Sequence, residues 1–190
     1  LDEAAAQCEA AIADDSSIPD AYNNLGTVRL KQNRLEDARI AFLSAVERKP
    51  DYVFALANLA NVSANLGDID AAATALVKAV QSDSGGFFDN ARIQETYFNL
   101  GAAAMKQKRY DRSAEFFRKV VEAVPTNVDA HRNLGLSLHM LGRSAEGIRE
   151  LEETIRKYPN SAESYNTLGL IFADRGQKQE AAANFQKALS

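Results

Sequence analysis

A dipeptide that begins with leucine recurs along the chain at nearly constant intervals. Its second residue is glycine or alanine, and the leucines are Leu25, Leu59, Leu100, Leu134 and Leu168. Successive copies are 34, 41, 34 and 34 residues apart, and each leucine is followed 13 residues later by a small residue and 17 residues later by Phe or Leu. A period of this length indicates an array of supersecondary units, each of which stacks on its neighbours to bury a core.

Each period predicts two helices joined by a short turn. The apolar and small positions after Tyr22 recur at helical spacing, with Arg29 as a polar exception. Small residues such as Gly26 and Ala38 let two helix backbones approach, and Phe42 can fill the space between neighbouring pairs. No segment alternates convincingly with the period of a strand, so we expect an all-α fold.

Residues that stop or start a helix mark the expected boundaries. A left-handed residue can end the first helix of a pair at Asn33, Gly67, Gly142 and Gly176. The second helix is expected to end at Pro50, Pro125 and Pro159. The candidate N-caps that follow are Asp51, Asn127 and Asn160.

These residues resemble the tetratricopeptide repeat family. The match is carried by Tyr22-x-x-Leu25-Gly26, Ala38-x-x-x-Phe42 and Pro50, and it recurs in five copies. The resemblance implies a right-handed superhelical solenoid of antiparallel helix pairs, with the first helix of each pair lining a concave groove. It predicts one array over 1–190: the second helix of a truncated repeat at 1–15, repeats at 19–52 and 53–83, an insertion at 84–90, and repeats at 91–127, 128–161 and 162–190, the last truncated at its end.

The composition argues against several classes of partner. A net charge of −4 gives no general attraction for phosphate backbones, so we expect no nucleic-acid partner. No apolar run approaches the roughly 20 residues that cross a bilayer, so we expect a soluble protein without membrane insertion and take the cytoplasm as the default compartment.

Catalytic and metal chemistry also find little support. The single cysteine, Cys8, excludes an intramolecular disulfide and is expected to be buried and inert. His131 and His139 are eight residues apart, roughly 12 Å along a helix, which is too far to share a metal. No phosphate-binding glycine loop or nucleophile motif is present. We therefore predict no catalytic residue, no metal, no cofactor and no enzymatic activity.

The residue before each leucine step is polar: Asn24, Asn58, Asn99, Asn133 and Thr167. An amide has both a donor and an acceptor, so a row of amides can pair with the main chain of an extended peptide without reading its sequence. The row resembles the asparagine ladder in the tetratricopeptide arm of O-GlcNAc transferase. The alternative is that these asparagines only satisfy local polar groups.

Residues three and seven positions further along each helix share the same face. The predicted peptide-binding groove contains Asn24, Thr27, Lys31, Asn58, Asn61, Asn65, Asn99, Lys106, Asn133, Leu136, Met140, Thr167 and Leu170. The groove is rich in amides around Asn61 and apolar around Leu136, Met140 and Leu170, although Met140 could also be ordinary packing.

Acidic residues stand four positions before most members of the row: Asp20, Glu95, Asp129 and Glu163. Chaperone-binding members of the family place basic residues there to grip a C-terminal carboxylate, so we predict no such clamp. We expect the partner to be a protein or peptide with a neutral or basic segment. The alternative is that the acids only offset helix dipoles.

The one long interval contains Ser84-Gly-Gly-Phe-Phe-Asp-Asn90. The register survives if Gly85-Gly86 forms a loop and the next helix is lengthened from about Asp89. Phe87 and Phe88 then anchor a partner or fill a gap near Phe54.

The chain opens at Leu1 within an expected helix and closes on an amphipathic helix, so we expect flanking sequence or a partner chain at its ends. The best-supported function is a non-catalytic protein–protein interaction scaffold that binds an extended segment in its groove. The alternatives are a structural module that self-associates through its terminal helix, around Phe185 and Leu189, and the substrate-recruiting arm of a larger enzyme.

Overall fold

The structure, a computed structural model, describes residues 1–86 and 90–189, without the side chains of residues 90–93. The described residues form eleven helices and no strand, so the predicted all-α fold is confirmed. The helices are α1 (Asp2–Asp14), α2 (Pro19–Lys31), α3 (Leu35–Arg48), α4 (Val53–Asn65), α5 (Ile69–Ser82), α6 (Asn90–Lys106), α7 (Tyr110–Ala123), α8 (Val128–Met140), α9 (Ser144–Lys157), α10 (Ala162–Asp174) and α11 (Lys178–Ala188).

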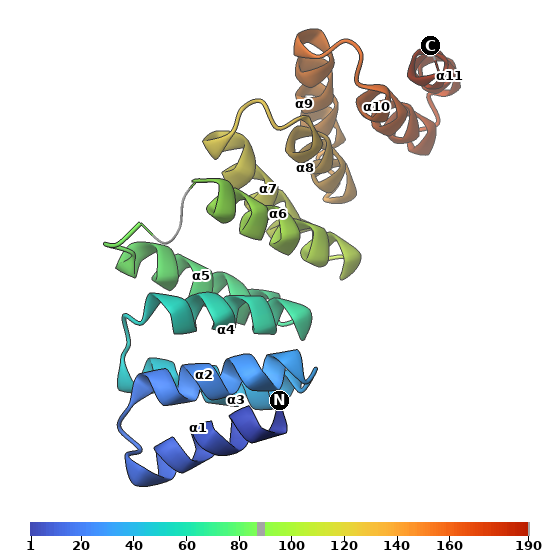
Figure 1. The fold of residues 1–190 in the computed structure, drawn as a ribbon. Coiled ribbons are helices and arrows are strands. Elements are labelled where there is room, and N and C mark those ends of the chain that lie inside the picture. The colour runs from blue at the N-terminus through green and yellow to red at the C-terminus, as the bar shows by residue number, and fades with distance from the viewer. Residues whose placement is uncertain (87–89, 190) are drawn as a thin grey trace. The chain divides into compact units, whose positions relative to one another are not determined.

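The helices belong to two units, residues 1–89 and 90–190. From α2 onward the helices are paired, and the first helices of the pairs are α2, α4, α6, α8 and α10 (Figure 1). In unit 1, α2 contacts α4 and α3 contacts α4. In unit 2, α8 contacts α10, α7 contacts α8 and α9 contacts α10. Each unit therefore brings at least two first helices side by side.

At the repeated leucine–glycine step, a large side chain of the second helix packs against the glycine of the first helix. A Cβ on Gly26 would lie 2.5 Å from a ring carbon of Phe42, and one on Gly101 would lie 2.9 Å from the Phe117 ring. Phe42 and Phe117 are both buried. In the pairs that have the glycine, the residue 17 positions after the leucine thus occupies the space that the glycine leaves open, and this contact holds the two helices together.

Most turns follow the predicted chemistry. The four predicted left-handed residues have φ of 59° at Asn33, 81° at Gly67, 80° at Gly142 and 75° at Gly176, and these predictions are confirmed. Lys108 adopts φ 60° in the turn between α6 and α7, where no turn residue was expected because lysine rarely takes this conformation.

The predicted N-caps were only partly correct. Asn127 caps α8, and its side chain accepts from the Ala130 amide at 2.9 Å. The caps of α4 and α10 are Tyr52 and Ser161, one residue later than predicted. At α10 the reason is that the Ser161 hydroxyl accepts from the Ser164 amide.

The helix after the insertion is longer than its counterparts, as expected. The first helix α6 has 17 residues, whereas α2, α4, α8 and α10 have 13 each. It begins at Asn90, one residue after the predicted start. Phe87 and Phe88 lie outside the described residues.

Candidate functional site

Two asparagines on neighbouring first helices bind each other in unit 1. The Asn58 side chain on α4 donates from Nδ2 to Oδ1 of Asn23 on α2 at 3.0 Å. Asn23 is 9% exposed, and its main-chain carbonyl also accepts from the Thr27 hydroxyl at 3.0 Å. We call Asn23 and Asn58 the amide pair. Asn23 directly precedes the row predicted from the sequence, which did not include it.

The remaining polar side chains of this surface are open to solvent. Asn24 and Lys31 on α2 and Asn61 and Asn65 on α4 are exposed, while Thr27 is partly buried. Asn65 Nδ2 lies 3.5 Å from Asn61 Oδ1, which is at the limit of a hydrogen bond. We call the polar surface of these two helices the amide face of unit 1. It consists of Asn23, Asn24, Thr27, Lys31, Asn58, Asn61 and Asn65.

The start of α4 lies beside the acidic start of α2. The Tyr52 hydroxyl donates to Asp20 Oδ1 at 2.5 Å, and burial, followed by this hydrogen bond, raises the pKa of Tyr52 to about 12. The Phe54 ring packs edge-on against Tyr52 with centroids 6.1 Å apart, and Phe54 is 50% exposed. One carboxylate of the predicted acidic row is thus bound within the protein.

Unit 2 presents a more apolar surface on its first helices. Leu136 and Met140 on α8 and Leu170 on α10 form what we call the apolar strip. Met140 is 45% and Leu170 51% exposed, whereas Leu136 is partly buried. Asn99 and Lys106 on α6 are exposed and Asn133 on α8 is partly buried.

Thr167 does not extend the row of exposed polar groups. It is 6% exposed, and its hydroxyl donates to the Glu163 carbonyl of the preceding turn at 2.8 Å. A threonine hydroxyl in a helix can bond back to its own turn in this way.

The two histidines are held by separate partners. His131 lies 2.5 Å from Glu150 Oε1 through Nδ1 and 3.0 Å from the Pro125 carbonyl through Nε2. The hydrogen bond to Glu150 raises the pKa of His131 above its ordinary 6.5 against the opposing effect of burial. His139 lies 2.9 Å from the Ser144 hydroxyl and 3.2 Å from Asp174 Oδ2. Both histidines therefore tie turns and helices together.

Metal-binding chemistry is not assembled in the part of the chain that the structure describes. No group of three or more His, Cys, Asp or Glu side chains there has the arrangement of a metal site. Cys8 is a free thiol and is only partly buried, which corrects the expectation of a buried one. Among the same residues, no helix combines the length and hydropathy that a bilayer crossing requires.

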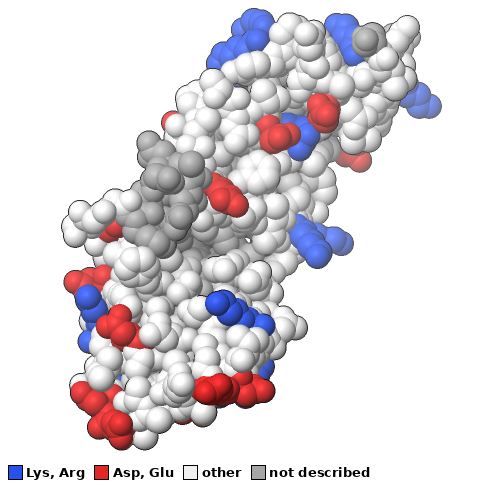
Figure 2. Space-filling view, in the orientation of Figure 1, with Lys and Arg blue, Asp and Glu red and all other residues white. Residues whose placement is uncertain are grey.

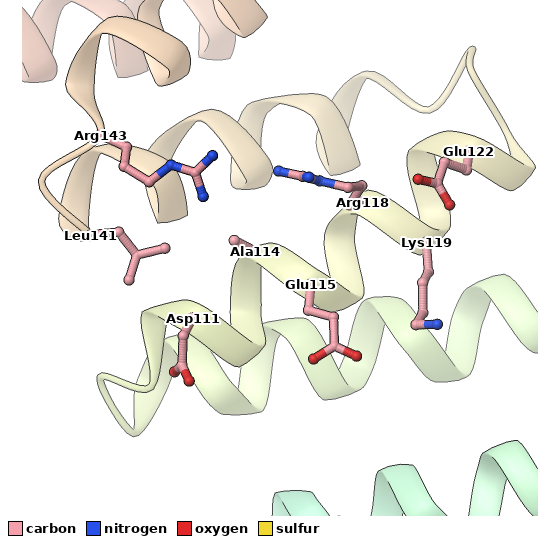
Figure 3. A pocket seen from close by; sticks show the side chains of 8 residues that line it. All are labelled: Asp111, Ala114, Glu115, Arg118, Lys119, Glu122, Leu141 and Arg143. Atoms are coloured by element: carbon pink, nitrogen blue, oxygen red, sulfur yellow. The ribbon is translucent and has the colours of Figure 1, made fainter.

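A separate depression of about 510 Å³ lies on α7 and the turn between α8 and α9 (Figure 3). Its lining is Asp111, Ala114, Glu115, Arg118, Lys119, Glu122, Leu141 and Arg143. Arg118 and Arg143 extend toward each other in Figure 3, but two nitrogens of Arg143 donate to Glu146 at 2.7 Å. Because cations and carboxylates alternate along this lining, the depression has no single sign of charge. Figure 2 shows the same mixture of both signs, separated by uncharged surface, on the face that it presents.

A model of the tetratricopeptide repeat family matches the chain in four segments, of which the last three overlap: residues 1–53, 57–128, 98–162 and 132–190. The chain belongs to the tetratricopeptide repeat family. This family builds protein-binding scaffolds from helix pairs, and its scaffolds are generally not enzymes. The chain is therefore a protein–protein interaction scaffold.

Curated relatives are distant and much longer than the chain. The heat shock protein STI1 of Saccharomyces cerevisiae is 29% identical over 96 residues, which are 50% of this chain and 16% of that protein. The peroxisomal targeting signal receptor of Candida albicans is 26% identical over an alignment that covers 100% of this chain and 38% of the receptor. The chain thus spans well under half the length of these relatives.

Solved structures share the fold. MamA superimposes with a TM-score of 0.67 at 23% identity, over 90% of each chain. YrrB, described as a tetratricopeptide protein with an unusual peptide-binding site, superimposes with a TM-score of 0.65 at 19% identity, over 96% of this chain and 90% of its own. At this identity the likeness shows the fold alone.

Proposed function

We propose that the chain binds an extended segment of another protein on the exposed faces of its first helices, and that it performs no chemistry on that segment. The observation that carries the proposal is the amide face of unit 1, where side-chain amides gather on two helices in contact. An extended segment has a donor and an acceptor on every residue and needs such partners when it leaves water.

The apolar strip supports binding of a side chain rather than of main chain. Met140 and Leu170 keep about half of their surfaces in water, and burial of apolar surface by a partner is favourable. Asn99 and Lys106 on α6 and Asn133 on α8 would supply polar contacts in the same unit. We therefore propose that unit 2 binds a partner segment through an aliphatic or aromatic side chain. We propose that unit 1 binds peptide backbone, in a manner comparable to the asparagine ladder of O-GlcNAc transferase.

Exposed carboxylates on three first helices make a neutral or basic segment the best fit. Glu95, Asp129 and Glu163 are exposed on α6, α8 and α10, and Arg132 compensates only Asp129, at 3.1 Å. A C-terminal carboxylate placed beside these groups would be repelled. We therefore propose that the segment is recognised along its length and not by its C-terminus.

A library of phage-displayed random peptides tests this function. Peptides selected by the wild-type chain are measured against a variant in which Asn24, Asn58, Asn99 and Asn133 are changed to alanine. The matched control changes Asn160, in the turn before α10, and Asn184, on the second helix α11, to alanine. We expect the first variant to lose at least about tenfold in affinity and the control to bind normally, with equal helicity by circular dichroism. Equal binding by both variants contradicts the proposal.

Self-association is a second candidate, and one observation favours it. Leu189, at the end of α11, is 90% exposed. A large apolar side chain in this state favours contact with another chain. Light scattering over a concentration series tests it: the mass of the wild type should rise with concentration, and the mass of Leu189→Asp should not.

The share of each relative that the chain covers favours one further arrangement. Because the chain aligns with only 16% to 38% of these two proteins, it can serve as the binding arm of a longer protein, including an enzyme whose substrate it recruits. In that case deleting the array from the parent should raise KM for a protein substrate and leave kcat for a short peptide unchanged.

A further inference from the structure

The amide pair contains a largely buried donor that nothing in the described chain uses. Asn23 is 9% exposed, yet its side chain makes one hydrogen bond, as an acceptor through Oδ1. Its Nδ2 carries two N–H donors without a partner among the described residues. Such a donor is costly to withdraw from water unless something binds it.

The Asn23 amide still opens to the surface. Its Nδ2 is not among the described side-chain atoms that are fully enclosed without a partner, a condition that Ser63 Oγ does meet. The Asn58 side chain is also without a partner at Oδ1, because its one hydrogen bond uses Nδ2. The pair thus leaves a donor on Asn23 and an acceptor on Asn58, on two amides that a 3.0 Å hydrogen bond joins.

This pattern matches one residue of an extended chain. In a strand the N–H and C=O of the same residue point to the same side, and a neighbouring strand bonds to both. A donor beside an acceptor can make the same two bonds. The hydrogen bond between the two amides also fixes which end of Asn58 faces outward, since its Nδ2 is held by Asn23.

We propose that Asn23 and Asn58 act as one composite site that binds the main chain of a single residue of the partner segment. Asn23 Nδ2 donates to the carbonyl of that residue, and Asn58 Oδ1 accepts from its N–H. The ligand is therefore an extended polypeptide of any sequence at this position. The inference rests on the proposed function. It adds that α2 contributes Asn23 to the site, a residue absent from the predicted row, and that α4 contributes Asn58.

The substitution Asn23→Asp separates this role from a purely structural one. An aspartate has the size of asparagine and still accepts from Asn58 Nδ2, so the contact between α2 and α4 is kept, but it has no N–H to give. The control is Asn160→Asp, which introduces the same charge at an exposed turn residue. The probe is the tightest peptide that the wild-type chain selects from the random library, measured by fluorescence polarisation.

We expect Asn23→Asp to weaken the probe by about tenfold and Asn160→Asp to leave it unchanged, with both variants retaining their helicity. Should Asn23→Asp fail to fold, the probe supplies a second route. Replacing each peptide N–H of the probe in turn by an ester oxygen removes one donor at a time. The wild-type chain should bind the probe more weakly when the ester replaces one particular N–H. The Asn58→Ala variant should bind this ester and the unmodified probe with equal affinity.

Two failures can be told apart. If the probe binds through the first helices but Asn23→Asp binds as well as Asn160→Asp, and no ester position depends on Asn58, the composite site is overturned while the proposed function stands. If no random peptide binds, or if alanine at the four row asparagines has no effect on binding, the proposed function and this inference fall together.

Discussion

The ring of Phe42 occupies the position that a side chain on Gly26 would need. Three of its ring carbons would lie within 2.9 Å of a Cβ at that residue, closer than carbon atoms approach in proteins. The glycine of the repeated dipeptide is therefore required by the packing of α3 on α2, since Phe42 is itself fully buried.

Gly26→Ala tests this contact with two effects of opposite sign. Alanine favours a helix over glycine by about 1 kcal/mol. Overpacking against a buried ring costs about 1–3 kcal/mol, so we expect a net loss of stability in urea unfolding. The double variant Gly26→Ala, Phe42→Leu should lose less free energy of unfolding than the two single variants lose in sum. Strict additivity of the two changes would show that the two residues do not compete for space.

The fold could be predicted because the same local contact is repeated. A small residue at Gly26 implies a large residue at Phe42, and the sequence shows both partners of this contact in every copy. Lys108 stands eight residues after Leu100, as Asn33 stands after Leu25, so the repeat register marks its left-handed turn although the preference of lysine itself does not.

Lys108→Gly should stabilise the protein. A left-handed φ of 60° costs a residue with a side chain about 1–2 kcal/mol, whereas glycine loses about 0.5–1 kcal/mol through its freer unfolded state. The expected gain is up to about 1 kcal/mol in the free energy of unfolding. The matched control is Ala102→Gly, which is exposed in the interior of α6 and should cost about 1 kcal/mol. A loss in both variants would show that the turn tolerates lysine without strain.

The contact between His131 and Glu150 should make stability depend on pH. The pKa of His131 is raised in the folded state, so its stabilising effect is complete below the unfolded pKa near 6.5 and is lost as the pH rises through the folded value. We expect Glu150→Gln to lower the free energy of unfolding by about 1 kcal/mol near pH 5.5 and by much less near pH 9. NMR titration should show the pKa of His131 fall in the variant. A destabilisation of equal size at both pH values would contradict the assignment.

The exposed carboxylates of the first helices predict how the end of a bound peptide behaves. Glu95, Asp129 and Glu163 repel a carboxylate, so amidation of the C-terminus of a selected peptide should leave its affinity equal or improve it up to about threefold at low salt. Adding about 0.5 M sodium chloride should remove the improvement. A peptide that binds only with a free carboxylate would show that the predicted absence of a C-terminal clamp is wrong.

The site was less predictable than the fold because exposure depends on neighbours. Asn58 and Thr167 hold the same place in the repeat, yet one is bound to Asn23 and the other is buried with its hydroxyl bonded to its own helix. Sequence spacing indicates which residues share a face, but not which polar groups find a partner within the protein.

Met140 and Leu170 provide a test of the apolar strip that is independent of the amides. Changing both to serine removes apolar surface that is about half exposed, so the cost to folding should stay below about 1 kcal/mol. Affinity for selected peptides that carry a large apolar side chain should fall by about tenfold, because that side chain loses its contact surface. The matched control is Leu43→Ser, since Leu43 is 42% exposed on α3, a second helix. If Leu43→Ser weakens binding as much as the double change, the partner lies on the second helices and the strip is not its site.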